Sequence, residues 1–268
     1  MKNLERMAGE VESIARAAGA FIRGEVDRIM KADVESKGLH NFVTYVDKQA
    51  EELIVGRLQQ LLPEAGFIVE EKTVEIKGER YNWVVDPLDG TTNFIHGIPV
   101  YSVSIALLQR EEVVLGVVYE PNRDECFRAV IGRGAMLNGR PIHVSSGGNI
   151  RESLVATGFP YYDYSRMQAF LEMFTWCMEN THGLRRLGSA AVDLAYVACG
   201  RFEAFYEYGL NPWDVAAGSL IVREAGGKVS DFSGGDGYLF GREIVAANDT
   251  IFPDFQGKIR ELFIRGRE

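Results

Sequence analysis

The chain has 268 residues, of which 46% are hydrophobic and 25% are charged, with 29 Gly and 8 Pro. This length and composition allow one large or two closely packed globular domains, and they exclude a disordered or fibrous protein. The net charge of -9, from 38 acidic and 29 basic residues, argues against a broad basic surface for nucleic acid. We therefore expect a globular protein that does not bind nucleic acid directly.

The three cysteines, Cys126, Cys177 and Cys199, are widely spaced and odd in number, which fits neither a disulfide framework nor a zinc site. Reduced thiols in the cytoplasm are the natural interpretation. The N-terminus mixes charged and apolar residues from its first turn, so it has no signal-peptide core, and no apolar stretch approaches the roughly 18 residues of a membrane span. We expect a cytoplasmic protein without membrane contact.

Apolar residues recur at spacings of three and four from Leu4 onward, which predicts an amphipathic helix that covers a sheet and ends at about residue 32. A polar, Gly-containing loop is expected over residues 36–42. Thr44 and Asp47 are spaced as in a capping box, which predicts a second helix to about residue 62.

Strands dominate the next part of the chain and form a meander beside these helices. They are predicted at residues 66–69, 81–85, 101–108, 113–120 and 125–130, with an Asn138-Gly139 turn beyond them. In the second half, strands at 154–157, 203–207 and 244–246 alternate with helices at 165–180, 189–199 and 212–225, and a final helix follows. The order is α+β in the first half and α/β in the second.

No internal repeat, low-complexity tract or compositional linker divides the chain. We therefore expect a single domain over residues 1–268. Ser-Ser-Gly-Gly-Asn within residues 145–151 separates strand-like segments, so a division into halves would fall there. The halves would be an α+β part over residues 1–147, with most of the candidate metal ligands, and an α/β part over residues 148–268.

The most informative stretch is Trp-Val-Val-Asp-Pro-Leu-Asp-Gly-Thr-Thr-Asn-Phe at residues 83–94, where two carboxylates follow an apolar strand. Pro87 is expected to end the strand pairing, and Gly90 permits close backbone approach before a short turn of helix. The N–H groups of a helix start favour an anion, whereas Asp86 and Asp89 would repel one. Divalent cations resolve that conflict, and carboxylate oxygens suit the hard ion Mg²⁺. The stretch therefore indicates metal-assisted phosphate chemistry.

Each of the acidic positions also has an ordinary structural interpretation. The two acids of residues 83–94 could only end a strand and cap a helix. Glu70 and Glu71 follow an apolar run, as residues of an exposed turn do. Asp214 lies in the first turn of a helix that starts with Asn211 and Pro212, where it could serve only the helix dipole, at about 0.3–1 kcal/mol.

The stretch at residues 83–94 resembles the first signature of the inositol monophosphatase family, Asp-Pro-Ile/Leu-Asp-Gly-Thr, which is intact here. Asn-Pro-Trp-Asp-Val-Ala-Ala-Gly at residues 211–218, followed by Glu-Ala-Gly-Gly at 224–227, is similar to the second signature of that family. The resemblance spans nearly the whole chain. It implies the layered αβαβα sandwich of the sugar-phosphatase superfamily, whereas periodicity alone indicates only a mixture of α and β.

The resemblance also implies a set of metal ligands. The ligand positions of a first ion match Glu70, Asp86 and the carbonyl of Leu88. Those of a second ion match Asp86, Asp89 and Asp214, and Glu70 could also reach a third ion. Asp214 would contact substrate as well. We expect two or three Mg²⁺ ions, with Mn²⁺ as a substitute and with Ca²⁺ and Li⁺ as inhibitors.

The implied reaction is hydrolysis of a phosphomonoester by in-line attack of a metal-activated water, without a phosphoenzyme. In the family a Thr hydroxyl linked to an Asp orients that water; Thr91 matches the Thr and Asp47 the Asp, and Glu70 is a further catalytic position. Asp47 is also the capping-box residue, and the two roles can coexist. The four His show no zinc-like pairing.

Substrate positions follow from the resemblance too. The backbone N–H groups of Gly90 and Thr91 match the phosphate cradle, and the loop Gly188, Ser189 and Ala190 matches one that faces the ring hydroxyls. Glu207 matches an acid that accepts hydrogen bonds from the polyol, but it could also simply end an edge strand. Arg185 matches a basic position near substrate in bacterial relatives, and a solvated surface arginine explains it equally well.

The Gly-Thr-Thr-Asn-Phe form of residues 90–94 is typical of inositol monophosphatases, whereas adenosine bisphosphate and histidinol phosphate phosphatases usually have Gly-Thr-Lys. We therefore expect hydrolysis of myo-inositol 1-phosphate and related polyol phosphates. A dual inositol monophosphatase and fructose 1,6-bisphosphatase is the alternative enzyme. A non-catalytic role with the transcription machinery, with which some bacterial relatives associate, is a second alternative. The resemblance further implies a homodimer.

Overall fold

The apolar stripe of the N-terminal segment forms the predicted helix. The computed structural model describes residues 2–26, 28, 34–38, 41–161 and 163–264. Helix α1 (Lys2–Glu25) buries Val11, Ala18 and Ile22 on one side. The helix is confirmed but ends before residue 32; residues 27 and 29–33 lie outside the described part of the chain.

Two paired strands follow, so the prediction of a loop was wrong for residues 36–38 and 41–42, while residues 39–40 lie outside the described part of the chain. Strand β1 (Val34–Gly38) pairs antiparallel with β2 (Asn41–Thr44). The polar sequence of this segment lacks the apolar alternation by which a strand is recognised. Backbone hydrogen bonds define the pairing, and they leave no such pattern in the sequence.

Helix α2 (Tyr45–Leu61) begins at the predicted capping box. The Thr44 N–H donates to the Asp47 carboxylate at 2.8 Å, and the Thr44 hydroxyl accepts from the Val46 N–H at 3.1 Å. These bonds satisfy donors that a helix start leaves without partners. They also fix the position of Asp47, which is buried.

A seven-stranded sheet follows, in the order β3-β4-β5-β6-β7-β8-β9. Its strands are β3 (Gly66–Val69), β4 (Tyr81–Asp89), β5 (Ser102–Gln109), β6 (Glu112–Glu120), β7 (Glu125–Val130), β8 (Ala135–Leu137) and β9 (Arg140–Ile142). Strands β3 and β4 are parallel, and from β4 onward each strand is antiparallel to the next. The predicted meander and its turn at Asn138 are confirmed.

Strand β4 contradicts one prediction, because its pairing does not end at Pro87. Asp86 pairs with Ser104 and Asp89 pairs with Ser102, so that two residues of β4 oppose one residue of β5 between these pairs. Such a β-bulge accommodates a proline, which has no N–H for the ladder. In a regular strand, residues three apart point to opposite faces, but the extra residue puts Asp86 and Asp89 on the same face.

A five-stranded sheet lies in the second half, in the order β11-β10-β12-β14-β13. Its strands are β10 (Leu154–Thr157), β11 (Gly183–Arg185), β12 (Ala204–Tyr208), β13 (Lys228–Ser230) and β14 (Glu243–Ala247). Strands β11 and β13 were not predicted, since three residues are too few to display a periodicity. The pairs of β10 with β11 and β12 are parallel, and those of β14 with β12 and β13 are antiparallel.

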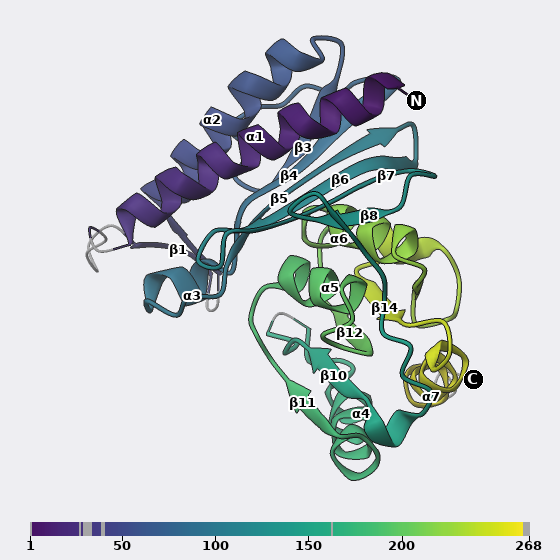
Figure 1. Ribbon diagram of the computed structural model, residues 1–268. Helices are drawn as coiled ribbons and strands as arrows, with labels where there is room; N and C mark the ends of the chain where they lie inside the picture. The colour runs from purple at the N-terminus through teal and green to yellow at the C-terminus, as the bar shows by residue number, and fades with distance from the viewer. Residues whose placement is uncertain (1, 27, 29–33, 39–40, 162, 265–268) are drawn as a thin grey trace.

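Helices and sheets alternate in five layers (Figure 1). Helices α1 and α2 cover one face of the large sheet, α5 (Ala190–Ala198) and α6 (Pro212–Glu224) lie between the two sheets, and α4 (Met167–Asn180) and α7 (Phe252–Phe263) cover the outer face of the small sheet. Three groups of buried apolar side chains join these layers. The predicted αβαβα fold is confirmed.

The three cysteines are free, and burial raises the pKa of Cys177 to about 12. That thiol therefore stays protonated and is a core residue rather than a nucleophile. Among the described residues, no helix combines the length and the apolar character needed to cross a membrane.

Candidate active site

Three carboxylates from distant parts of the chain converge beside the bulge of β4. Oxygens of Asp86, Asp89 and Asp214 all lie within 4.8 Å of one another. The bulge turns the first two toward α5 and α6, since the neighbouring Ser104 donates to the Trp213 carbonyl at the start of α6 at 3.0 Å. The Asp214 carboxylate accepts from the capping backbone at this helix start, so its ordinary local role is also present.

Glu70 joins these acids from the end of β3. Its N–H donates to the Val85 carbonyl at 3.3 Å, which extends the pairing with β4, and its side chain bonds to that of Asp86. The turn after it is held by Glu51, whose buried carboxylate accepts from the N–H groups of Glu71 and Thr73, each at 2.8 Å. Glu51 therefore shapes the turn that carries Glu70.

The acids of this cluster share a poorly solvated space. Burial, then repulsion from Asp214, raises the pKa of Glu70 well above its ordinary value, and burial, then repulsion from Glu70, does the same to the pKa of Asp86. Burial raises the pKa of Asp89 to about 6, and burial with repulsion from Asp89 raises the pKa of Asp214 to about 7. Such groups keep protons unless cations replace them. An all-oxygen donor set fits hard divalent cations such as Mg²⁺.

The backbone between the acids is tightly confined. The Leu88 N–H donates to the Asp86 carboxylate at 2.9 Å, while the Leu88 side chain packs in the core beneath α1 and α2. Gly90 has a φ of 102° and precedes the short helix α3 (Thr91–Ile95). A Cβ at this position would lie 3.1 Å from the Val100 carbonyl and 3.2 Å from that of Gly188, so both conformation and space require glycine.

Thr91 and Asp47 meet although 44 positions separate them. The Thr91 hydroxyl lies 3.0 Å from the Asp47 carboxylate and 3.1 Å from the Leu88 carbonyl, and it can donate its hydrogen bond to either of them. Because a hydroxyl has one hydrogen and two lone pairs, Thr91 keeps acceptor capacity toward the site. Burial raises the pKa of Asp47 to about 6, in spite of its hydrogen bonds from Thr44.

The loop of Gly188, Ser189 and Ala190 lies against Asp89. The Ser189 hydroxyl donates to the Asp89 carboxylate at 2.6 Å, and the Ala191 N–H donates to the same oxygen at 2.8 Å. The loop is also tied to α3, because the Asn93 side-chain amide donates to the Leu187 carbonyl at 2.8 Å. The structure therefore brings this predicted loop to the acidic cluster.

Glu207 lies on β12 and faces the same space. A Cβ added at Gly158 would lie only 1.9 Å from the Glu207 carboxyl group, so this side chain rests directly on the glycine backbone. Burial, followed by repulsion from Asp214 and Asp89, raises the pKa of Glu207 to about 8. Glu207 is thus beside the acidic cluster rather than an exposed strand end.

The two neighbouring arginines take different positions. Both arginines are exposed, and Arg185 donates to the Leu184 carbonyl at 2.8 Å. The guanidinium of Arg186 lies about 5 Å from the ring centres of Phe159 and Tyr161, and its charge acts on the site acids. The structure does not bring Arg185 to the cluster, whereas it does bring Arg186.

Sequence reasoning missed Arg186, Asn93 and Asp193, which is buried in α5 near the cluster. Adjacent arginines cannot be told apart without knowing that Arg185 ends β11, because side chains alternate along a strand. The signal for Asp193 was available: it is the one charged residue in the apolar segment Ala190–Ala198.

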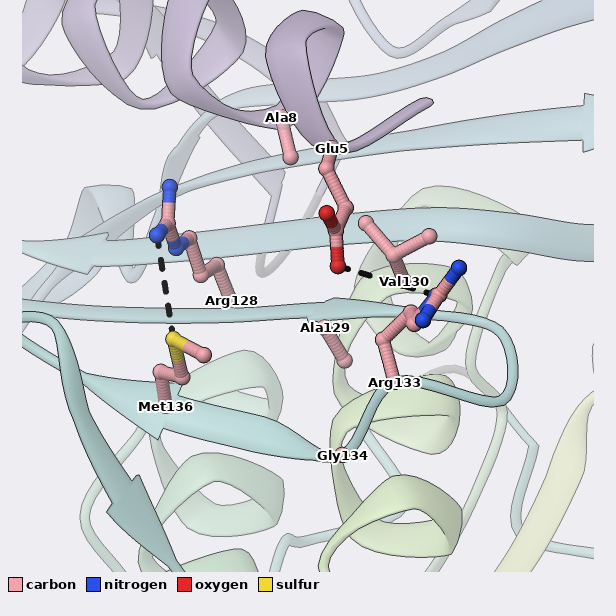
Figure 2. A pocket seen from close by; sticks show the side chains of 8 residues that line it. All are labelled: Glu5, Ala8, Arg128, Ala129, Val130, Arg133, Gly134 and Met136. Carbon is pink, nitrogen blue, oxygen red and sulfur yellow. Dashed lines mark hydrogen bonds and ion pairs between the residues drawn. The ribbon is translucent and has the colours of Figure 1, made fainter. Parts of the chain in front are cut away.

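A separate pocket of about 180 Å³ lies beside α1 (Figure 2). Figure 2 shows Arg133 facing Glu5 of α1, at 3.6 Å, and Arg128 next to Met136. Arg128 also pairs with Glu12 at 3.4 Å. The charged side chains at this pocket are thus paired with acids of α1.

A model of the inositol monophosphatase family matches residues 3–267. The chain is 45% identical over 243 residues to the Nus factor SuhB of Pseudomonas aeruginosa, covering 89% of this chain and 90% of that protein. It is 41% identical over 238 residues to the inositol-1-monophosphatase of Mesorhizobium japonicum, covering 88% and 90%. The structure matches that of the Thermotoga maritima IMPase with a TM-score of 0.85 at 34% identity, covering 98% of each chain.

The matched region contains both signatures and all four acids of the cluster. The family match also accounts for the five-layer fold, which the Thermotoga maritima structure shares. The chain therefore belongs to the inositol monophosphatase family.

Proposed function

We propose that this protein is a Mg²⁺-dependent phosphatase that hydrolyses myo-inositol 1-phosphate and related polyol monophosphates to the free polyol and phosphate. The observation that carries the proposal is the convergence of Asp86, Asp89 and Asp214 near a hydroxyl that Asp47 holds. The three carboxylates can hold cations that bind a phosphate. The hydroxyl of Thr91, held by Asp47, can orient an attacking water molecule.

One ion would be held by Glu70, Asp86 and the Leu88 carbonyl, and a second by Asp86, Asp89 and Asp214; Glu70 could also reach a third. When bound, divalent cations neutralise the phosphoryl oxygens and make a water more acidic. Mn²⁺ would substitute for Mg²⁺, and Ca²⁺ and Li⁺ would inhibit. The raised pKa values of the cluster support cation binding, because each cation replaces protons that the acids otherwise retain.

Thr91 would orient the attacking water. With its hydrogen directed to Asp47, the Thr91 oxygen accepts a hydrogen bond from water and leaves a water lone pair directed at phosphorus. The P–O bond to water would form as the ester P–O bond in line with it breaks, and the departing polyol oxygen would take up a proton from solvent, so no phosphoenzyme is needed. Asp47, with a pKa of about 6, can take up the proton that passes through Thr91.

The phosphate would rest on the N–H groups of Gly90 and Thr91, and the polyol would lie between the Gly188–Ala190 loop and Glu207. Glu207 would accept hydrogen bonds from ring hydroxyls. We propose Arg186, rather than Arg185, as the arginine at this side, since the charge of Arg186 acts on Glu207 and Asp89.

The test is phosphate release from inositol 1-phosphate, fructose 1,6-bisphosphate and adenosine 3′,5′-bisphosphate, with and without Mg²⁺. Preferred, Mg²⁺-dependent hydrolysis of inositol 1-phosphate that the isosteric Asp89→Asn variant lacks would support the proposal. Preference for fructose 1,6-bisphosphate would favour the dual enzyme. No release from any substrate by folded protein with Mg²⁺ would refute a phosphatase function.

A second candidate function is a binding role in transcription, because a relative at 45% identity is named a Nus factor. The Asp214→Asn variant separates the two, since it should lose hydrolysis and retain the fold. If this variant rescues a deletion strain and still retains transcription proteins in a pull-down, the binding role is favoured. If the variant loses both rescue and hydrolysis, the enzyme function is favoured.

We also propose a homodimer. Support comes from exposed apolar side chains on and near α4, where Phe159 is 37% exposed, Leu171 49% and Met178 57%. Apolar side chains gathered on one surface often mark an interface. Light scattering of the purified protein tests this, and a Leu171→Glu variant that remains dimeric would exclude α4 from the interface.

A further inference from the structure

Helix α2 supports the candidate site at two points from one of its faces. Asp47 and Glu51 are four residues apart, so their side chains leave the helix on the same side, and both are buried. The Asp47 carboxylate lies 3.0 Å from the Thr91 hydroxyl. Glu51 binds the turn that follows Glu70. The helix therefore fixes this turn relative to the hydroxyl that is proposed to orient water.

Glu51 uses both of its carboxylate oxygens in this turn. The Glu71 N–H donates to one oxygen at 2.8 Å, and the N–H and the hydroxyl of Thr73 donate to the other, each at 2.8 Å. Three donors on one side chain suit an ionised carboxylate, which only accepts hydrogen bonds. A single side chain from the core thus binds the backbone on both sides of Lys72.

Lys72, which lies between these bonds, has a strained backbone. Its φ of 57° falls in the left-handed region, which a residue with a Cβ adopts only at a cost in free energy. Lys72 and Thr73 are exposed, so packing of their side chains does not impose this conformation. The hydrogen bonds to Glu51 offset the cost, and without them the turn should relax to another conformation.

We propose that Glu51 is a positioning residue: by holding Lys72 in the left-handed conformation, it keeps the Glu70 carboxylate at the cation that Glu70 would share with Asp86. The proposal rests on the metal-dependent function proposed above. The Glu70 N–H donates to the Val85 carbonyl at 3.3 Å, so β4 holds this backbone on one side and Glu51 holds it on the other. Because its oxygens bond within the turn, Glu51 acts through the backbone and not as a ligand.

An amide at position 51 would release the turn without changing the shape of the side chain. Glu51→Gln replaces one acceptor oxygen by an NH₂ group, which meets an N–H of the turn as a second donor. Glu71 is only half-buried and Thr73 is exposed, so a released N–H can bond to water, and we expect the variant to fold. Glu52→Gln is the matched control, because Glu52 is the neighbouring acid of α2 and is exposed.

The test titrates metal-free protein with MgCl₂ in a calorimeter, which requires no substrate. We expect Glu51→Gln to weaken the Mg²⁺ affinity about fivefold or more, and Glu52→Gln to stay within about twofold of wild type. Amide hydrogen exchange of residues 71–73 in the metal-free protein should become at least about tenfold faster in Glu51→Gln, with that of β4 unchanged. With inositol 1-phosphate, the Mg²⁺ concentration for half-maximal rate should rise about fivefold, and kcat at saturating Mg²⁺ should stay within about threefold.

A second substitution tests whether the strain at Lys72 is the link. Asn adopts the left-handed conformation more readily than Lys, so Lys72→Asn should restore part of the lost Mg²⁺ affinity. Because this change also removes a positive charge, it is made both in wild type and in the Glu51→Gln background. We expect the gain in Mg²⁺ affinity to be about threefold larger in the Glu51→Gln background.

Equal Mg²⁺ affinities of Glu51→Gln and wild type would overturn the proposal, as would equal gains from Lys72→Asn in the two backgrounds. Faster hydrogen exchange throughout the large sheet would show a general structural role and would also overturn it. If Glu51→Gln does not fold, Thr73→Val, which removes one of the three bonds, must weaken Mg²⁺ binding, and an unchanged affinity contradicts the proposal.

The outcome for Glu51 is separable from that for the proposed reaction. Wild type that binds Mg²⁺ but hydrolyses no phosphate ester would refute the phosphatase function alone, since the titration and the hydrogen exchange still decide the role of Glu51. Folded wild type that binds no Mg²⁺ would overturn the positioning role as well.

Discussion

The Ser189 hydroxyl donates a hydrogen bond to the Asp89 carboxylate at 2.6 Å, which joins residues 100 positions apart. The same Ser189 caps α5 by accepting from the Val192 N–H at 3.3 Å, and Ser102 of β5 lies 3.2 Å from its hydroxyl. Since that hydroxyl donates to Asp89, Ser102 must be the donor to Ser189. The start of α5 and the end of β4 therefore hold each other in place, and the acidic cluster forms only when the layer of α5 and α6 packs on the large sheet.

Replacing the Thr91 hydroxyl by a methyl group tests its proposed role with water. We expect Thr91→Val to lower kcat for inositol 1-phosphate by about 10² or more, because the group that orients the nucleophile is lost. Its Tm should stay close to that of wild type, since Asp47 keeps two bonds from Thr44. Thr91→Ser, which retains the hydroxyl, is the matched control. Equal kcat values for the Val and Ser variants would contradict the role.

The pKa values of the acids predict how metal-free protein responds to pH. The pKa of Asp89 is about 6 and that of Asp214 about 7 in the folded protein, whereas unfolded Asp titrates near 3.9. Between pH 4 and 7 the folded state therefore binds more protons than the unfolded state, and stability must fall as pH rises. With a chelator present, we expect the Tm to drop by at least about 4 °C between pH 5 and pH 7.5.

Added Mg²⁺ should raise the Tm more at pH 7.5 than at pH 5, because the cations then compete with fewer protons. Asp214→Asn should flatten the pH dependence of the metal-free protein. A Tm that rises with pH in the presence of chelator would show that these acids are not protonated in the folded state.

Close contact between β6 and α6 predicts a destabilising substitution. A Cβ at Gly116 would lie 2.8 Å from the Ala217 carbonyl oxygen and 3.0 Å from its Cα atom. Because neither backbone atom can move easily, Gly116→Ala should destabilise by about 1–3 kcal/mol in urea unfolding. The control is Gly56→Ala on the exposed side of α2, where nothing lies within 4 Å, and which should stabilise by about 0.5–1 kcal/mol. Equal effects of the two substitutions would exclude the steric explanation.

The adjacent arginines offer a matched pair for the substrate side of the site. We expect Arg186→Ala to raise the KM for inositol 1-phosphate about tenfold, through the loss of a charged donor, and Arg185→Ala to stay within about twofold of wild type. Steady-state kinetics of both variants gives the comparison. The reverse order would mean that β11 is placed incorrectly relative to the site.

Predictions succeeded where near neighbours in the chain decide the structure. The capping box at Thr44 and Asp47 was recognised because its hydrogen bonds join residues three apart. The start of α6 at Pro212 was found for the same reason. The three-residue strands β11 and β13 were missed, since they are too short to show a periodicity and their pairing partners lie elsewhere in the chain. Strands β1 and β2 pair with each other, and they were missed because their polar residues show no apolar alternation.

The sequence by itself determined which side chains are available for chemistry: two signatures with their acids, a glycine where only glycine fits, and amphipathic segments that must form layers. The tertiary structure alone decided how they meet. Only the bulge in β4 puts Asp86 and Asp89 on one face, and only the packing of α6 on that face brings Asp214 to them. The pattern of apolar residues shows which surfaces are buried. The position of a bulge and the way a helix layer packs on a sheet depend instead on contacts between residues far apart in the chain.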